Sequence, residues 1–250
     1  MKTNRLHWIA LAFSTAFLAA CGGGSDGAND DVTTANPTGI WTGSTSTDRS
    51  VTGVVLGDGT YYVLYSQVGV PGAIAGVLQG SGSTSGSTFS SVNGKDFNFE
   101  EGGVFDATVS ATVSTQQAFN GTVSYSLSSQ TRQLTTTYNP ISASPASPSA
   151  VQGTYSGNVV TSAGSESATL NVTLDGNFSG TGTSGCAVSG SVTPRTDVNA
   201  YNISVSFGPF PCLFADQTFS GVALLEGNLL RAAAPNNART DGILFIGNRP

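Results

Sequence analysis

The sequence has few charged residues and almost no histidine. Only 10% of its 250 residues are Asp, Glu, Lys or Arg, and its single histidine is His7. Beyond that position the chain therefore cannot form a Ser-His-Asp triad, a Cys-His pair or the common histidine-based zinc sites. We expect no enzyme, no metal site and no cofactor.

Basic residues are also scarce. The chain has nine Lys and Arg against fifteen Asp and Glu, a formal net charge of -6. Such a surface lacks the positive patch that nucleic acid requires and repels anionic lipid headgroups. We expect no nucleic-acid partner and no electrostatic contact with a membrane.

Long hydrophobic runs are absent. The longest lies at Ile9 to Leu18, follows the basic residues Lys2 and Arg5, and is too short to span a bilayer. These features predict a secretory signal peptide over residues 1–20.

The four residues that end this segment, Leu18-Ala19-Ala20-Cys21, resemble the lipobox of bacterial lipoproteins. The resemblance implies cleavage before Cys21 and a diacylglycerol on its thiol, so that acyl chains hold the protein at the membrane. Gly22, in place of the aspartate that retains lipoproteins at the inner membrane, implies the outer membrane of the cell envelope.

Two polar stretches divide the rest of the chain. Residues 21–38 are Gly-rich and predict a flexible, disordered tether, whereas residues 139–150 contain three prolines among small residues and predict a stiffer linker. We therefore predict two folded domains, one at residues 39–138 and one at residues 151–250.

The two halves resemble each other. Gly39-Ile40-Trp41 opens the first and Gly153-Thr154-Tyr155 opens the second, and each half then has an aromatic residue shortly after an Asp-Gly pair, Asp58-Gly59 or Asp175-Gly176. We interpret this correspondence as a diverged duplication. The Gly-x-Trp at Gly39 to Trp41 is similar to the opening of lipocalin-type barrels.

Apolar and polar residues alternate over several short runs, most plainly at 107–114 and 119–127 in the first half, and again at 168–174 and 201–207 in the second. Alternation with a period of two predicts half-buried strands, and the Asp-Gly and Asn-Gly pairs between the runs favour tight turns. We count about eight strands in each half. The predicted fold is all-β: two consecutive antiparallel meander barrels, or barrel-like sandwiches.

Cys186 and Cys212 remain once Cys21 is set aside. In an exported protein two such cysteines usually pair, so we expect a disulfide.

Four aromatic residues are candidates for a binding surface. Trp41 and Tyr155 either belong to such a surface or plug a barrel end. Tyr62 lies on the strand face opposite Tyr61 and Tyr65 and is either exposed or buried, while Phe210 lies in a Gly-Pro-Phe-Pro bend.

One acidic group, formed by Asp96, Glu100, Glu101 and Asp106, could supply calcium ligands or a carboxylate pair for glycoside hydrolysis, but its spacing favours a solvated loop.

Three functions fit these features. The leading hypothesis is a non-enzymatic envelope lipoprotein that displays two β modules to a protein or glycan. The second is a lipocalin-like carrier of a small apolar ligand, with small inward residues such as Ala107 and Ala111 leaving space inside one barrel. The third is an exported hydrolase that uses carboxylates alone.

Overall fold

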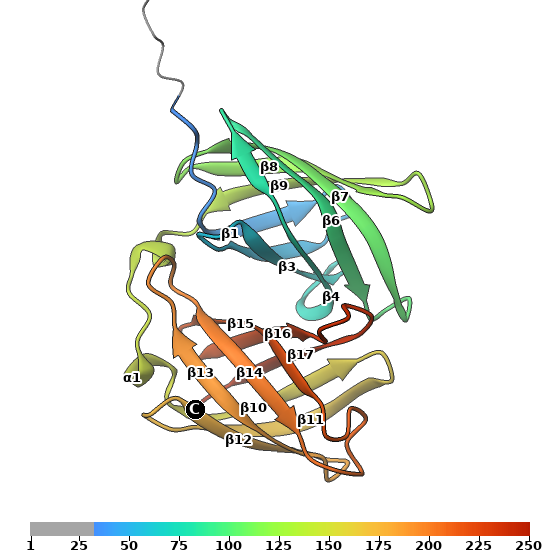
Figure 1. Ribbon diagram of the computed structural model, residues 1–250, viewed down its shortest axis with the longest axis vertical. Helices are drawn as coiled ribbons and strands as arrows, with labels where there is room; N and C mark the ends of the chain where they lie inside the picture. The colour runs from blue at the N-terminus through green and yellow to red at the C-terminus, as the bar shows by residue number, and fades with distance from the viewer. Residues whose placement is uncertain (1–32) are drawn as a thin grey trace, which may run out of the picture. The chain divides into compact units, whose positions relative to one another are not determined.

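The computed structural model describes residues 33–250, which are almost entirely β-structure (Figure 1). The predicted signal peptide, the lipobox and Cys21 lie outside the described residues. The first nine strands are β1 (Gly39–Thr45), β2 (Ser50–Val55), β3 (Thr60–Gln67), β4 (Val70–Ser81), β5 (Ser83–Ser85), β6 (Thr88–Asn98), β7 (Gly103–Ser114), β8 (Ala118–Tyr125) and β9 (Thr131–Tyr138). The 3-10 helix η1 (Pro140–Ala143) and the short helix α1 (Pro148–Val151) follow. The last eight strands are β10 (Gly153–Thr161), β11 (Gly164–Val172), β12 (Asn177–Gly182), β13 (Ala187–Pro194), β14 (Tyr201–Phe207), β15 (Thr218–Glu226), β16 (Leu229–Pro235) and β17 (Gly242–Asn248).

Both halves close into barrels. In the first half, neighbouring strands follow the order β4-β3-β2-β1-β9-β8-β7-β6, and a further β4–β6 pairing closes a ring of eight, with β5 paired to β6 beside it. In the second half β10 to β17 form a closed barrel of eight strands. The prediction of two consecutive eight-stranded antiparallel barrels is confirmed. Closure pairs the strand edges that an open sheet would leave exposed.

The predicted alternation is visible in β7, where Ala107, Val109, Ala111 and Val113 are buried and the residues between them are exposed. The two Asp-Gly pairs occupy the same place in each barrel, between its second and third strands. Gly59 and Gly176 both have φ of +81°, a backbone conformation that glycine adopts without steric cost. The correspondence expected from a duplication therefore extends to turn geometry.

Aromatic side chains fill one end of the first barrel. The ring centroids of Trp41 lie 5.4 Å from Tyr138 and 5.8 Å from Phe119, and Phe89 packs edge-on against Phe119. The Trp41 indole N–H donates to the carbonyl of Pro37 at 2.9 Å, and the backbone N–H of Ala35 donates to the carbonyl of Gly86. The last residues of the predicted tether are thus bound to the barrel.

Residues 139–150 are folded against both barrels. Asn139 donates its backbone N–H to Ile40, and the Asn199 amide in the second half donates to the carbonyl of Ile141 at 2.9 Å. A shared hydrophobic cluster continues this contact and includes Val54, Tyr62, Leu64 and Phe97 of the first half and Val222, Leu224 and Leu244 of the second. The barrels are joined by a core, and residues 33–250 form one compact unit.

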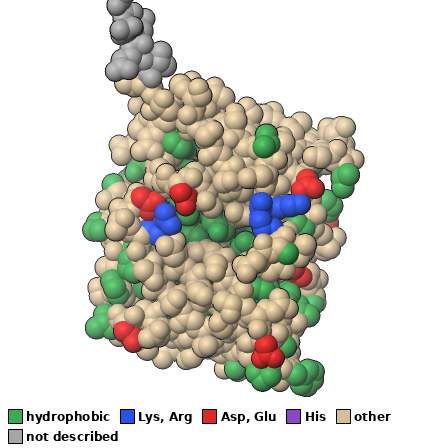
Figure 2. Space-filling view, viewed as in Figure 1, with side chains coloured by type: hydrophobic (Ala, Val, Ile, Leu, Met, Phe, Trp, Pro, Cys, Tyr) green, Lys and Arg blue, Asp and Glu red, His purple; other side chains and the backbone are tan. Residues whose placement is uncertain are grey.

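No helix within residues 33–250 has the length and apolar character needed to cross a bilayer. Charged side chains are few on the face shown in Figure 2 and stand in small groups.

Candidate functional site

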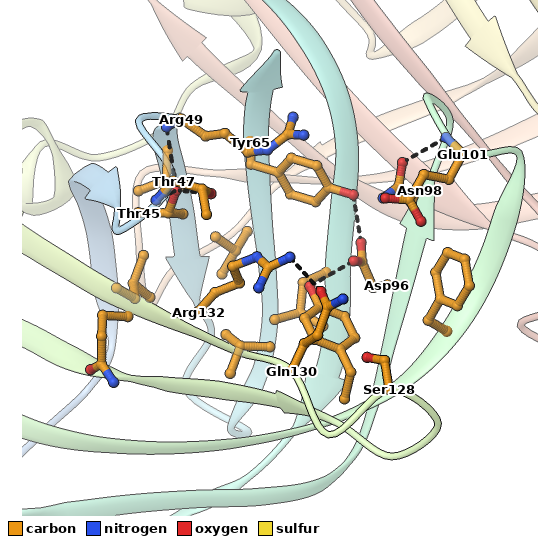
Figure 3. Close-up of a pocket in the computed structure, with 18 of the residues that line it drawn as sticks. Thr45, Thr47, Arg49, Tyr65, Asp96, Asn98, Glu101, Ser128, Gln130 and Arg132 are labelled. Atoms are coloured by element: carbon orange, nitrogen blue, oxygen red, sulfur yellow. Dashed lines mark hydrogen bonds between the residues drawn. The ribbon is translucent and has the colours of Figure 1, made fainter. Parts of the chain in front are cut away.

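A cavity of about 260 Å³ lies at the end of the first barrel remote from Trp41 (Figure 3). The turns β1–β2, β3–β4, β6–β7 and β8–β9 are at this end. Thr47, Glu101 and Ser128 from three of these turns line the cavity together with residues of the barrel wall. The meander therefore brings segments from many parts of the chain to one opening.

The inner wall of the cavity is apolar. It is formed by Val51, Val63, Leu78, Val123 and Leu134, which come from five different strands and face inward by alternation. The same five side chains border a space of about 20 Å³ on the side of the aromatic end. The cavity therefore closes toward the middle of the barrel.

A buried carboxylate lies in the wall of this cavity. Asp96 on β6 is only 2% exposed, and both of its oxygens accept hydrogen bonds from tyrosines. Tyr65 Oη on β3 donates to Oδ1 at 2.7 Å, and Tyr125 Oη on β8 donates to Oδ2 at 2.8 Å. Figure 3 shows the Tyr65 hydroxyl pointing toward the Asp96 side chain, with the hydrogen bond between them drawn as a dashed line.

Burial shifts the acidity of this group. Loss of solvent raises the pKa of Asp96, although the hydrogen bonds from Tyr65 and Tyr125 act in the opposite direction. Burial, and the carboxylate beside them, raise the pKa of Tyr65 and of Tyr125. Both tyrosines therefore remain protonated donors at neutral pH.

Two neighbours hold Tyr65 in place. A Cβ atom at Gly76 would overlap the Tyr65 hydroxyl, so glycine is required there for the ring to reach Asp96. On the other side, the Arg49 guanidinium lies 5.5 Å from the Tyr65 ring centroid. Arg49 also forms an ion pair with Glu100 at 2.7 Å and donates to the carbonyl of Ser66 at 2.7 Å.

The rim carries further polar groups. Arg132 donates to Oε1 of Gln130 at 2.5 Å, and Asn98 Oδ1 accepts the backbone N–H groups of Glu100 and Glu101. Lys95 is ion-paired with Asp106. The basic side chains at this end are thus already engaged with protein groups.

A second, smaller cavity lies inside the second barrel. Its volume is about 90 Å³ and its lining is almost wholly apolar. The loop between β14 and β15 contributes Leu213 and Phe214 to that lining. The disulfide between Cys186 and Cys212 ties this loop to the β12–β13 connection, as the sequence predicts.

Three of the four predicted surface aromatics are buried, so they cannot form a binding surface. Trp41 is 2% exposed in the aromatic end of its barrel. Tyr155 is fully buried, and its hydroxyl donates to the carbonyl of Val151 at 2.9 Å. Tyr62 is 7% exposed because the second barrel covers the outer face of β3. Phe210 is 90% exposed.

The acidic group is only partly a solvated loop. Glu100 and Glu101 lie in the β6–β7 turn and are exposed, but Asp96 faces the barrel interior. The reason is a register shift in β6 between Ser91 and Gly94, which reverses the inward and outward faces of the strand. Ala107 and Ala111 do point inward, yet neither lines the cavity.

Tyr65, Tyr125, Arg49 and Arg132 were not candidates from sequence. Alternation places Tyr65 and Tyr125 on inner faces, which is a usable signal, but nothing in the sequence indicates that both meet one carboxylate. Within residues 33–250 no group of three or more His, Cys, Asp or Glu side chains could hold a metal ion.

No family model matches this sequence, and no curated protein matches it. A search of solved structures finds the crystal structure of a "putative outer membrane protein" from Bacteroides fragilis, with 16% identity, 85% of this chain and 95% of that chain covered, and a TM-score of 0.27. A TM-score of this size supports no statement about function.

Proposed function

We propose that this protein is a non-enzymatic binding protein of the bacterial cell envelope whose first barrel takes up a small ligand through its open end. The supporting observation is the 260 Å³ cavity, which combines an apolar inner wall with a few fixed polar groups. Small-molecule sites have this character, and eight-stranded barrels are just wide enough to enclose one small ligand. Of the three functions considered from sequence, the carrier fits this cavity best.

The polar groups favour binding over reaction. Asp96, Tyr65 and Tyr125 are held by one another and by the barrel wall, so they offer a preorganised surface to a ligand. Both Asp96 oxygens accept from tyrosine hydroxyl groups, so the carboxylate is held in one orientation as a fixed acceptor for a ligand donor.

A test of ligand uptake is native mass spectrometry of the protein after gentle extraction from its host. We expect a bound small molecule, and we expect Val123→Phe, which fills the cavity, to remove it. Ser124→Phe, on the outer face of the same strand, is the matched control and should keep the ligand. Absence of any bound species from the unaltered protein would contradict the proposal.

The envelope location rests on the lipobox resemblance at Leu18 to Cys21. We expect labelled palmitate to be incorporated into the mature protein and the Cys21→Ser variant to stay unlabelled. Contact with the membrane is then through the acyl chains. An unlabelled product that fractionates with the cytosol would contradict this part of the proposal.

A second candidate function is the display of a docking surface to a protein or glycan, which one observation favours. Phe210 is 90% exposed and Leu213 is 57% exposed on a loop that the disulfide restrains. Crosslinking on intact cells tests this candidate, with the Phe210→Ser variant as the comparison. A partner that is crosslinked to the unaltered protein but not to Phe210→Ser would support a display function.

A further inference from the structure

The Asp96 carboxylate has no cationic partner. Within residues 33–250, neither Asp96 nor Glu101 forms an ion pair, whereas Glu100, Asp106, Asp197 and Glu226 each do. Burial of a charged group without an opposite charge is strongly unfavourable in general. The two tyrosine hydroxyl groups reduce this cost but bring no positive charge.

The carboxylate can still accept further hydrogen bonds. Each carboxylate oxygen has about two acceptor positions, and each oxygen of Asp96 uses one for a tyrosine. The remaining positions are available to a donor that enters the cavity. The ring of Tyr125, and that of Phe105 in the lining, add faces that attract cations.

The charges around Asp96 favour a positive ligand. The groups that face the cavity are Arg49, Arg132, Glu101 and Asp106. Arg49 is paired with Glu100 and Asp106 is paired with Lys95, whereas Arg132 donates to the uncharged Gln130 and keeps its positive charge. With Asp96 and the ion-pair partners included, these groups are four carboxylates and three cationic side chains, so the charge at this end is negative by one.

The size of the cavity limits the ligand. At about 30 Å³ per water-sized group, a volume of 260 Å³ accommodates about nine non-hydrogen atoms. The wall formed by Val51, Val63, Leu78, Val123 and Leu134 requires that most of these atoms be apolar.

We infer that the cavity of the first barrel selects a small protonated amine, with its ammonium group at Asp96 and an apolar body against the valine and leucine wall. This inference rests on the proposed function, since it names the class of ligand that the barrel carries. The ammonium replaces the solvation that burial removes from the carboxylate. A neutral ligand of the same shape cannot supply this solvation, and the carboxylate repels an anionic ligand.

The experiment is isothermal titration calorimetry of the mature protein with three probes of nearly equal size: phenethylammonium, phenethyl alcohol and phenylacetate. Phenethylammonium has about nine non-hydrogen atoms, the number that fills the cavity. Hydrogen bonds to charged groups contribute enough that we expect it to bind at least about tenfold more tightly than the alcohol. Phenylacetate should bind most weakly.

Two variants locate the effect. In Asp96→Asn the preference for the amine over the alcohol should fall to about one, while binding of the alcohol changes little, because the asparagine amide can still bond both tyrosines. Asp216→Asn removes an exposed carboxylate from the second barrel and should leave all three affinities unchanged. If Asp96→Asn does not fold, the ranking of the three probes on the unaltered protein still decides.

The possible failures are distinguishable. Equal binding of the amine and the alcohol, or tightest binding of phenylacetate, would overturn the inference while leaving ligand uptake by the barrel intact. Binding of none of the probes, together with no bound molecule in native mass spectra, would overturn the proposed function as well.

Discussion

The disulfide between Cys186 and Cys212 provides a test of how far the two barrels depend on each other. It joins residues 26 apart in the sequence, from the β12–β13 connection to the loop after β14. On the chain-entropy model a loop of this length restricts the unfolded chain enough to stabilise the fold by about 3 to 4 kcal/mol. Replacement of both cysteines by serine removes that contribution and leaves no free thiol at either position.

The expected shift in melting temperature depends on the size of the cooperative unit. For a unit of 150–250 residues, about 1 kcal/mol lowers the melting temperature by about 2 to 4 °C, so the variant should melt about 6 to 16 °C lower. Because a shared buried core joins the barrels, we expect residues 33–250 to unfold together.

Trp41 makes the coupling measurable, since it is the only tryptophan after residue 21 and lies in the first barrel. We expect its fluorescence to report the same lowered transition as circular dichroism, although the lost cross-link is in the second barrel. Dithiothreitol should lower the melting temperature of the unaltered protein equally and leave the serine variant unchanged. A Trp41 transition that stays in place, or a shift below about 3 °C, would refute the reasoning.

Three further predictions concern single side chains. Tyr65→Phe leaves one oxygen of the buried Asp96 carboxylate without its hydrogen-bond donor. The free energy of unfolding, measured by urea denaturation, should fall by about 1 to 3 kcal/mol. The decrease should be smaller when the same change is made in the Asp96→Asn variant. Because the pKa of Asp96 is raised by folding, the folded state binds more protons than the unfolded state between the unfolded pKa of about 4 and the folded pKa. The free energy of unfolding of the unaltered protein, relative to that of Asp96→Asn, should therefore fall as pH rises through this window and then level off. A difference in urea midpoints between the two proteins that does not change with pH would contradict this prediction. Leu224→Ala opens a cavity between the barrels and should cost about 2 to 5 kcal/mol, whereas Phe210→Ala, at an exposed position, should change stability by less than about 0.5 kcal/mol in the same titrations. Similar effects of these two changes would mean that the shared core does not stabilise the fold.

Local patterns predicted much of the fold. The alternation in β7 and β14 shows a half-buried strand directly, because successive side chains of a strand point to opposite faces. The same pattern was wrong at the ends of two runs: Leu127 and Leu174 are exposed because they lie in the turns after β8 and β11. Asp58-Gly59 and Asp175-Gly176 predicted turns because glycine tolerates positive φ. The Asn-Gly pairs did not: Asn93-Gly94 lies within β6 and Asn120-Gly121 within β8. The disulfide followed from having two cysteines in a chain expected to be exported.

The outward faces were harder to interpret. Tyr62 and Leu224 lie on strands that carry apolar side chains on both the inner and the outer face. The outer face is apolar because the other barrel covers it. A sequence pattern reports that a residue avoids water. It does not report whether the barrel interior or a neighbouring barrel provides the cover.

The candidate site depended on one irregularity in β6. If side chains alternated strictly from Phe89 onward, Phe97 would face the barrel interior and Asp96 would face outward. The register shift between Ser91 and Gly94 reverses these two directions. Phe97 therefore joins the core between the barrels, and Asp96 lines the cavity.

The sequence alone therefore determined that strands form, where several of them turn and that the chain builds two antiparallel β units of about eight strands, because these follow from interactions between residues close along the chain. Only the tertiary structure decided that β3, β6 and β8 bring two tyrosines and one aspartate together inside the first barrel. That meeting depends on barrel closure and on a one-residue change of register, and both are set by packing between distant segments.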